Sequence, residues 1–295
     1  MLTVNAAELS PAQLQNYMQY AIAPRPICFA TTIDQEGNIN LSPFSFFNMF
    51  STNPPLCIFS PARRVRDNTT KHTLENVLEV KECVINIVNY PMVQQMSLAS
   101  TEYAKGVNEF DKSGFTMLPS DLVKPPRVAE APVQMECIVK EVIHLGDNPG
   151  AGNLILAEVK LIHIKEEILD EDGRIDQAKI DLVARLGGDW YCRVTADNLF
   201  KVAKPLTTLG IGVDALPKGV RNSKVLTGND LGMLGNIEHL PTDDEIDAIQ
   251  NHPEVKEIFD ATIGDSHNRE RELHELARQW LSIGNVNDAL KVVLL

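Results

Sequence analysis

PRPICFATTIDQEGNINLSPFSFFNMF, residues 24–50, predicts a β-hairpin. A β-type run at 24–33 is closed by the turn DQEGN at 34–38, and residues 39–50 return as a second strand. Pro43 interrupts the return strand and has no N–H for a ladder hydrogen bond, so we expect an edge strand, a bulge or a bend there. The strand also places hydroxyl and amide side chains among phenylalanines, which a simple core strand does not require.

The rest of the first two thirds of the chain predicts many short strands and few helices. Two long alternating runs, joined by GDNPGAG, predict an antiparallel hairpin with one buried face. The expected strands are 53–62, 83–89, 133–145 and 153–167, and the expected helices are 9–20, 68–80 and 91–100. Strands and helices do not alternate, and no G-x-G-x-x-G or Walker loop is present, which disfavours a Rossmann sheet. The predicted fold is mainly β, an antiparallel barrel with peripheral helices.

The composition changes after about residue 205. A connection rich in Gly, Asn and Leu leads into helices, and Thr242 and Glu245 have the spacing of a capping box. A later helix carries an apolar stripe made of Leu273, Leu276, Trp280 and Leu281. We expect this stripe to pack on the barrel or on a partner subunit. The expected domains are therefore a barrel at 1–205 and a loop-rich, helical C-terminal extension at 206–295.

The composition limits which binding partners and which cellular location are expected. The 295 residues are 44% hydrophobic and carry a net charge of −13, so nucleic acid and anionic membranes are disfavoured as partners. Five cysteines form no C-x-x-C pair and are expected to be reduced core thiols: Cys28, Cys57, Cys83, Cys137 and Cys192. The N-terminus shows no signal-peptide pattern and no apolar run is long enough to span a bilayer, so a cytoplasmic location is expected.

Three stretches are more polar than their surroundings require. SPARRVRDNTTKHT at 60–73 gathers basic and hydroxyl side chains just before a predicted helix, which suits phosphate; the alternative is a solvated basic turn. ATT at 30–32, with the return strand, suits the rim of a flat polar heterocycle; the alternative is that its phenylalanines fill the core. EYAKGVNEF at 102–110 is the third. Histidines and cysteines lack ligand spacing, so no metal site is predicted.

Six pieces of sequence, taken in order, closely resemble the flavin reductase-like, FMN-binding split-barrel family. This family includes flavoredoxins and the reductases of two-component monooxygenases. The pieces are RPI (25–27), T-x-D-x-x-G-x-x-N-x-[SA]-P-F-S-F-F (32–47), PP (54–55), K-x-T-x-x-N (71–76), VNEF (107–110) and ARLGG (184–188). The resemblance runs from about residue 20 to 195 and leaves the final quarter of the chain uncovered.

The resemblance implies a bound FMN, with NADH or NADPH as the electron donor. It assigns the ring-side wall to Thr31, Thr32, Asn40, Ser42, Pro43, Phe44, Ser45 and Asn48. It assigns the ribityl-phosphate end to Ser60, Arg64, Lys71, His72 and Thr73. Many relatives carry aspartate where this chain has His72, so a carboxylate role at that position is in doubt, although an imidazole still suits phosphate.

The function implied is hydride transfer from NAD(P)H to bound or substrate flavin, and the protein need not supply an acid, base or nucleophile. No catalytic residue is therefore assigned. The electrons would pass to free flavin, a partner monooxygenase or another acceptor, and such barrels usually pair as homodimers. The alternatives are a flavoredoxin-like electron carrier without NAD(P)H turnover and a flavin-binding module whose tail recruits a partner. A pyridoxamine-phosphate-oxidase-like activity is a more distant alternative.

Further residues near the family motifs have two interpretations each. Arg185 can reach the flavin or nicotinamide side, or form a structural salt bridge. Arg193 and His144 are further candidates, but a lone histidine at an alternating strand position is more readily explained as structural. Gly187 and Gly188 are more readily explained as residues of a tight turn.

Overall fold

The structure is a computed structural model of residues 1–295, and it divides into two compact units, Met1–Phe200 and Lys201–Leu295. The division lies slightly before the change of composition at about residue 205. Each unit has a hydrophobic core of its own, so each is described by itself.

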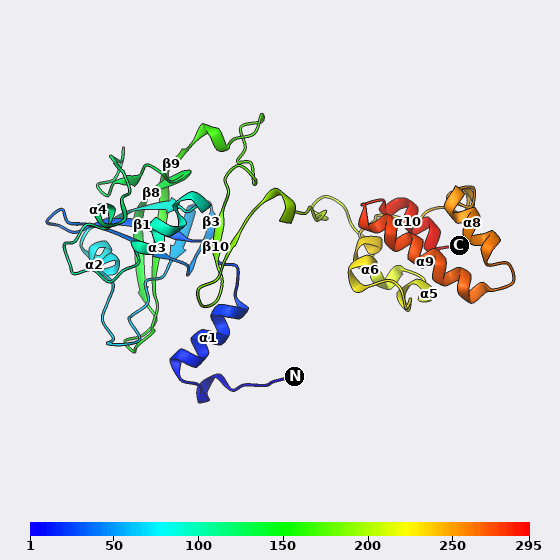
Figure 1. Ribbon diagram of the computed structural model, residues 1–295, viewed down its shortest axis with the longest axis horizontal. Helices are drawn as coiled ribbons and strands as arrows, with labels where there is room; N and C mark the ends of the chain where they lie inside the picture. The colour runs from blue at the N-terminus through cyan, green and yellow to red at the C-terminus, as the bar shows by residue number, and fades with distance from the viewer. The chain divides into compact units, whose positions relative to one another are not determined.

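A seven-stranded antiparallel sheet forms the first unit (Figure 1), with the strand order β2-β1-β5-β8-β9-β4-β3. Its strands are β1 Cys28–Ile33, β2 Ile39–Phe44, β3 Phe47–Thr52, β4 Pro55–Phe59, β5 Glu82–Ile87, β8 Val133–His144 and β9 Asn153–Ile164. Two short pairs accompany it, β6 Met117–Leu118 with β7 Arg127–Val128 and β10 Val183–Arg185 with β11 Tyr191–Arg193.

The two edges of the sheet are β2 and β3, yet only Ser45 and Phe46 separate these strands in the chain. So short a connection can join the two edges only if the sheet curls until they approach each other, as in a split barrel. The prediction of one return strand over 39–50 is therefore wrong, because the chain forms two strands at opposite edges. Pro43 lies in the edge strand β2, where a missing N–H is tolerated, as predicted.

Alternate residues of the strands fill the barrel interior. The long hairpin of β8 and β9 confirms the alternating pattern, with Val139 and Ile155 inside. Cys28, Cys57, Cys83 and Cys137 are buried free thiols of the core, as predicted, whereas Cys192 is partly exposed. Burial raises the pKa of the Cys57 thiol to about 11, which keeps it protonated and unreactive at neutral pH.

Four helices belong to the first unit: α1 Pro11–Ala21, α2 His72–Glu79, α3 Val93–Leu98 and α4 Glu109–Ser113. Helix α1 begins as predicted, with Ser10 forming a capping box with Gln13. No residue of α1 is buried. Helix α2 packs on β1 and β2 through an apolar face that includes Leu74 and Val77.

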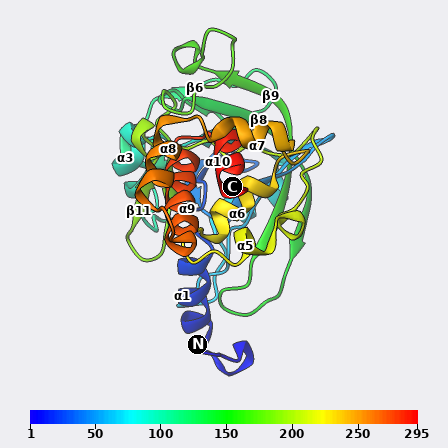
Figure 2. The same ribbon diagram turned by 90° about the vertical axis from the view of Figure 1, so that its right-hand side faces the viewer.

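The second unit is helical, with α5 Lys218–Arg221, α6 Gly228–Gly235, α7 Asp243–Ile249, α8 Pro253–Ala261, α9 Ser266–Ser282 and α10 Val286–Val293. Helices α9 and α10 lie side by side (Figure 2). The capping box of Thr242 with Glu245 is confirmed. The α9 stripe of Leu273, Leu276, Trp280 and Leu281 packs in this unit's own core, so its assignment to the barrel or a partner is wrong. No helix of the chain has the length and apolarity that a bilayer crossing requires.

Candidate functional site

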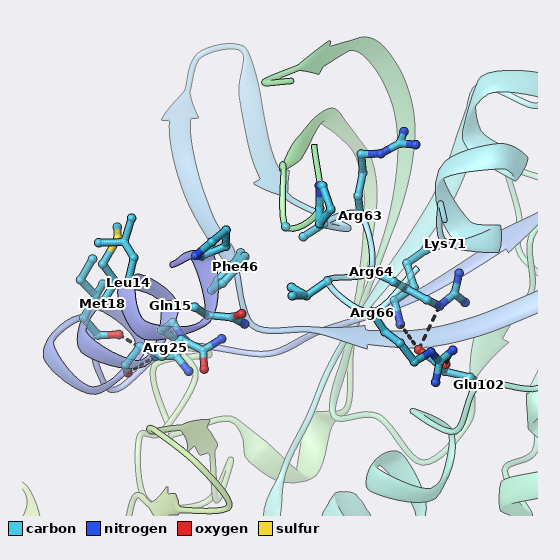
Figure 3. A pocket seen from close by; sticks show the side chains of 17 residues that line it. Leu14, Gln15, Met18, Arg25, Phe46, Arg63, Arg64, Arg66, Lys71 and Glu102 are labelled. Carbon is cyan, nitrogen blue, oxygen red and sulfur yellow. Dashed lines mark hydrogen bonds and ion pairs between the residues drawn. The ribbon is translucent and has the colours of Figure 1, made fainter. Parts of the chain in front are cut away.

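A groove on the first unit runs past α1, the basic segment 60–73 and the polar end of β2. Its largest part is a cavity of about 630 Å3 between α1 and the basic segment (Figure 3). A second cavity, of about 340 Å3, shares Phe46 and Lys71 with the first and is lined by residues 42–45. A third, of about 310 Å3, shares part of that β2 wall and reaches Arg185. We call these three adjoining cavities the site groove.

One end of the site groove is cationic. Arg64 Nε lies 2.9 Å from one carboxylate oxygen of Glu102, and Arg66 Nη2 lies 2.8 Å from the other (Figure 3). Lys71 Nζ lies 3.7 Å from the same carboxylate. Burial, and then the charge of Arg64, lower the pKa of Lys71. Three cations therefore share one carboxylate at this end.

The N-terminus of α2 opens beside these cations. Lys71 is the N-cap residue, and no side chain caps the first-turn N–H groups. The Leu74 N–H already bonds to the Lys71 carbonyl, at 2.9 Å; the earlier amides of the first turn and the helix dipole both favour an anion. The preceding turn is held by Arg63, which donates to the side chain and the main-chain oxygen of Asn68, each at 2.8 Å. Asn68 adopts a left-handed backbone, φ 59°, which asparagine tolerates.

A layer of buried polar side chains lies behind the β2 wall. Thr73 donates to Asn40 at 2.6 Å, and Asn40 donates to Glu109 at 2.9 Å. Thr31 and Thr32 accept hydrogen bonds from two buried asparagines. Burial raises the pKa of Glu109, against the hydrogen bonds that its carboxyl accepts. This network joins β1, β2, α2 and α4, and so fixes the strand that forms the wall.

The predicted ligand-binding residues fall into three groups. Those on the surface of the site groove are Ser42, Pro43, Phe44, Ser45, Ser60, Arg64 and Lys71. Those in the buried layer are Thr31, Thr32, Asn40 and Thr73, whose side chains bond to other protein groups. Asn48 is exposed on β3 and accepts from the Met49 N–H, and His72 is the half-buried first residue of α2; neither lines the site groove. Direct ligand contact remains a prediction for all of them.

Arg25 is absent from the predicted site residues, although it opens the RPI motif. Its guanidinium donates to two carbonyls at the end of α1, at 2.5 and 2.8 Å, and to the Leu186 carbonyl at 2.8 Å. Its Nε also lies 3.4 Å from the Ser45 hydroxyl. Burial, and then the charge of Arg185, lower its pKa. Arg25 therefore ties three walls of the site groove together. A charged residue between two prolines at the start of an apolar run was the available sequence signal.

The β10–β11 hairpin forms the far end of the site groove. Arg185 stacks on Tyr191, 4.6 Å from the ring centroid, and its nearest carboxylate, Asp189, is 4.0 Å away. Arg193 instead pairs closely with Asp181, with nitrogen–oxygen distances of 2.6 and 2.9 Å, which gives it a structural role. The charge of Arg185 is thus the less neutralised of the two.

Two other residues have structural roles. His144 Nδ1 lies 2.6 Å from the Asn153 side-chain oxygen, which anchors the end of β8. A Cβ added at Gly187 would lie 2.4 Å from the Tyr20 ring, so glycine is required for α1 to approach the hairpin this closely.

One group of potential metal ligands exists, formed by Asp121, Glu136 and His163. The fully buried Glu136 carboxylate accepts three backbone N–H bonds from residues 121–123 and lies 2.7 Å from His163 Nε2. Its oxygens are therefore already occupied by protein donors. These bonds lower the pKa of Glu136 against the effect of burial, the largest single influence. Glu136 therefore has a structural role, because its carboxylate holds the loop at residues 121–123 in place.

A family model described as flavin reductase like domain matches residues 20–179. The chain is 28% identical to nitrilotriacetate monooxygenase component B from Bacillus cereus, over 68% of this chain and 98% of that one, with a TM-score of 0.64. It is 27% identical to 2-nitrobenzoate 2-nitroreductase from Pseudomonas fluorescens, over 72% and 100%, with a TM-score of 0.62. It is 26% identical to a Shewanella frigidimarina protein described as a flavin reductase with a split barrel domain, over 67% and 95%, with a TM-score of 0.57.

Proposed function

This chain belongs to the flavin reductase-like family, and we propose on that premise that the site groove binds FMN for hydride transfer from NADH or NADPH. The observation that carries the proposal is the continuity of the groove. It leads from three cations and an uncapped helix N-terminus to the polar wall at 42–45. Those two ends suit a phosphate and a flat heterocycle, respectively.

The residues present fit FMN in charge and in size. Arg64, Arg66 and Lys71 against Glu102 and Asp67 leave a net charge of +1 at the cationic end, opposite in sign to the phosphate. A phosphate monoester carries about −1.5 to −2 at neutral pH. The main cavity of about 630 Å3 lies within the usual range for ligand sites, roughly 300–1,000 Å3.

When bound, FMN supplies the ring that accepts hydride, and the side chains supply binding and orientation. Arg64, Lys71 and the first turn of α2 hold the phosphate. The hydroxyls and backbone of residues 42–45 orient the edge of the ring, and Arg25 fixes the walls around it. Arg185 leaves positive charge at the far end, which favours the approach of an anionic donor such as a nicotinamide dinucleotide.

The first test is an anaerobic absorbance spectrum of the protein with FMN, before and after NADH or NADPH. We expect the flavin band to bleach within seconds with at least one donor, which would also identify the preferred nucleotide. A bound flavin that neither donor reduces would favour the electron-carrier or binding-module alternatives. Absence of bound flavin, together with no turnover in excess FMN, would refute the proposal.

The proposed electron acceptor is free flavin or a partner monooxygenase. One relative is a component B of a monooxygenase, which supports this choice. A second relative is a nitroreductase, so a nitroaromatic compound is the competing acceptor class. Anaerobic reoxidation of the reduced protein by 2-nitrobenzoate would favour the nitroaromatic acceptor over free flavin and a partner monooxygenase.

We propose that the protein is a homodimer. Helix α1 buries no residue and exposes Met18 and Tyr20, while β3 exposes Met49 and Phe50. A second copy that covers these apolar side chains would remove them from water. Light scattering should give twice the chain mass of 32.7 kDa; a monomer would contradict the proposal.

We also propose that the second unit is a separate domain, since it has its own core.

A further inference from the structure

Glu102 is the one acidic side chain at the cationic end of the site groove that contacts all three cations. It belongs to the polar stretch 102–110, to which the proposed function assigns no role. Its carboxylate lies 2.9 Å from Arg64, 2.8 Å from Arg66 and 3.7 Å from Lys71. Hydrogen bonds from the two arginines, Arg64 first, keep the pKa of Glu102 below its ordinary value. The group is therefore an anion at neutral pH.

Two of the three cations do not need Glu102 to hold their positions. Arg64 also donates to the Thr69 hydroxyl at 2.8 Å and to a backbone carbonyl. Arg66 also donates to Asp67, at 3.2 and 3.0 Å. Removing the Glu102 charge would thus leave both guanidinium groups held in place. The N–H groups that now donate to Glu102 would become available to another acceptor.

Glu102 is also accessible from solvent. Its side chain is 39% exposed, and it lies in the connection between α3 and α4, outside any helix or strand. The other acidic groups nearby have partners of their own: Asp67 pairs with Arg66, and Glu75 accepts from Thr70 and lies 3.8 Å from Lys105. Only Glu102 stands where an incoming anion would meet Arg64, Arg66 and Lys71 together.

We propose that the Glu102 carboxylate holds the place of the flavin phosphate and is displaced when the phosphate binds. This inference rests on the proposed function and assigns Glu102 as the residue that sets the affinity for phosphate. Each FMN must replace an internal ion pair, which weakens its binding. The displaced carboxylate can re-form its contacts when FMN leaves, so the flavin is exchangeable rather than permanently held.

The test is the substitution Glu102→Gln, with FMN, riboflavin and inorganic phosphate as probes in calorimetric titrations. Since displacement of the carboxylate is no longer required, we expect FMN and phosphate to bind about tenfold more tightly. Riboflavin, which lacks the phosphate, should bind as it does to the unaltered protein. Glu79→Gln removes a negative charge from the C-terminal end of α2, where the carboxylate accepts the Gln35 N–H and contacts none of the three cations, and should change FMN affinity by less than about threefold.

Other results would overturn the inference. Weaker FMN binding by Glu102→Gln would mean that Glu102 positions the cations. An equal gain for riboflavin, or an equal gain in Glu79→Gln, would mean a general effect of charge or structure. Glu102→Ala is a second variant that removes the same charge. Thermal unfolding of both variants shows whether either substitution impairs folding. If the unaltered protein binds neither flavin, the proposed function itself has failed; if it binds FMN and the variants show no gain, only this inference has.

Discussion

Replacing Arg64 and Lys71 together by alanine should weaken FMN binding about a hundredfold and leave riboflavin binding almost unchanged. Both side chains line the cationic end of the site groove and share the Glu102 carboxylate. Charge-assisted hydrogen bonds to phosphate contribute about 1.5–3 kcal/mol each, and riboflavin has no phosphate to lose. The dissociation constants of the two flavins can be measured by the quenching of flavin fluorescence.

A matched pair of surface substitutions serves as the control. Arg174→Ala with Lys140→Ala removes the same charges from exposed positions that do not line the site groove. This variant should bind both flavins as the unaltered protein does. Equal losses for FMN and riboflavin in the Arg64 and Lys71 variant would assign those residues to general structure and remove the phosphate from that end of the groove.

The predicted elements that the structure confirms are those whose signals are local. Ser10 caps α1, and the alternation of β8 and β9 determines which face is buried, because each depends on residues close in sequence. The division of 39–50 into β2 and β3 depends instead on the closure of a seven-stranded sheet. No local sequence pattern predicts which two strands will form the edges that approach each other when the sheet curls.

The candidate site shows the same contrast between features that depend on local sequence and features that depend on the folded chain. The Arg64 and Lys71 segment could be recognised because its basic residues lie close together in the sequence of an acidic chain. Glu102 lies more than thirty residues away, and its contact with them arises only when the α3–α4 connection reaches the basic turn. A family motif also does not separate residues that line a groove from those that support it. Thr32, Asn40 and Thr73 belong to the motif pieces, and Thr31 directly precedes one, yet their side chains lie in the buried layer.

Replacing Arg25 by alanine should weaken FMN and riboflavin equally, by about thirtyfold or more, in contrast to the phosphate-end variant. Arg25 is only 7% exposed, and its bonds hold the end of α1, the Leu186 carbonyl and Ser45 together. Without it, the carbonyls of Gln19, Ile22 and Leu186 lose this donor, and we expect the walls of the groove to separate. Loss of such a buried, charged donor costs about 3 kcal/mol in the free energy of unfolding, which urea denaturation can measure.

Two comparison variants isolate this positioning role of Arg25. Arg25→Lys keeps the charge but lacks the planar fork of donors, so it should restore only part of the flavin affinity. Arg193→Ala removes another arginine of the same unit, whose partner Asp181 lies outside the site groove, and should cost about 1 kcal/mol or less with no change in flavin binding. If Arg25→Ala impaired FMN but not riboflavin, Arg25 would act on the phosphate. If it lowered the stability and left both affinities intact, the walls that Arg25 joins would not be the walls of the flavin site.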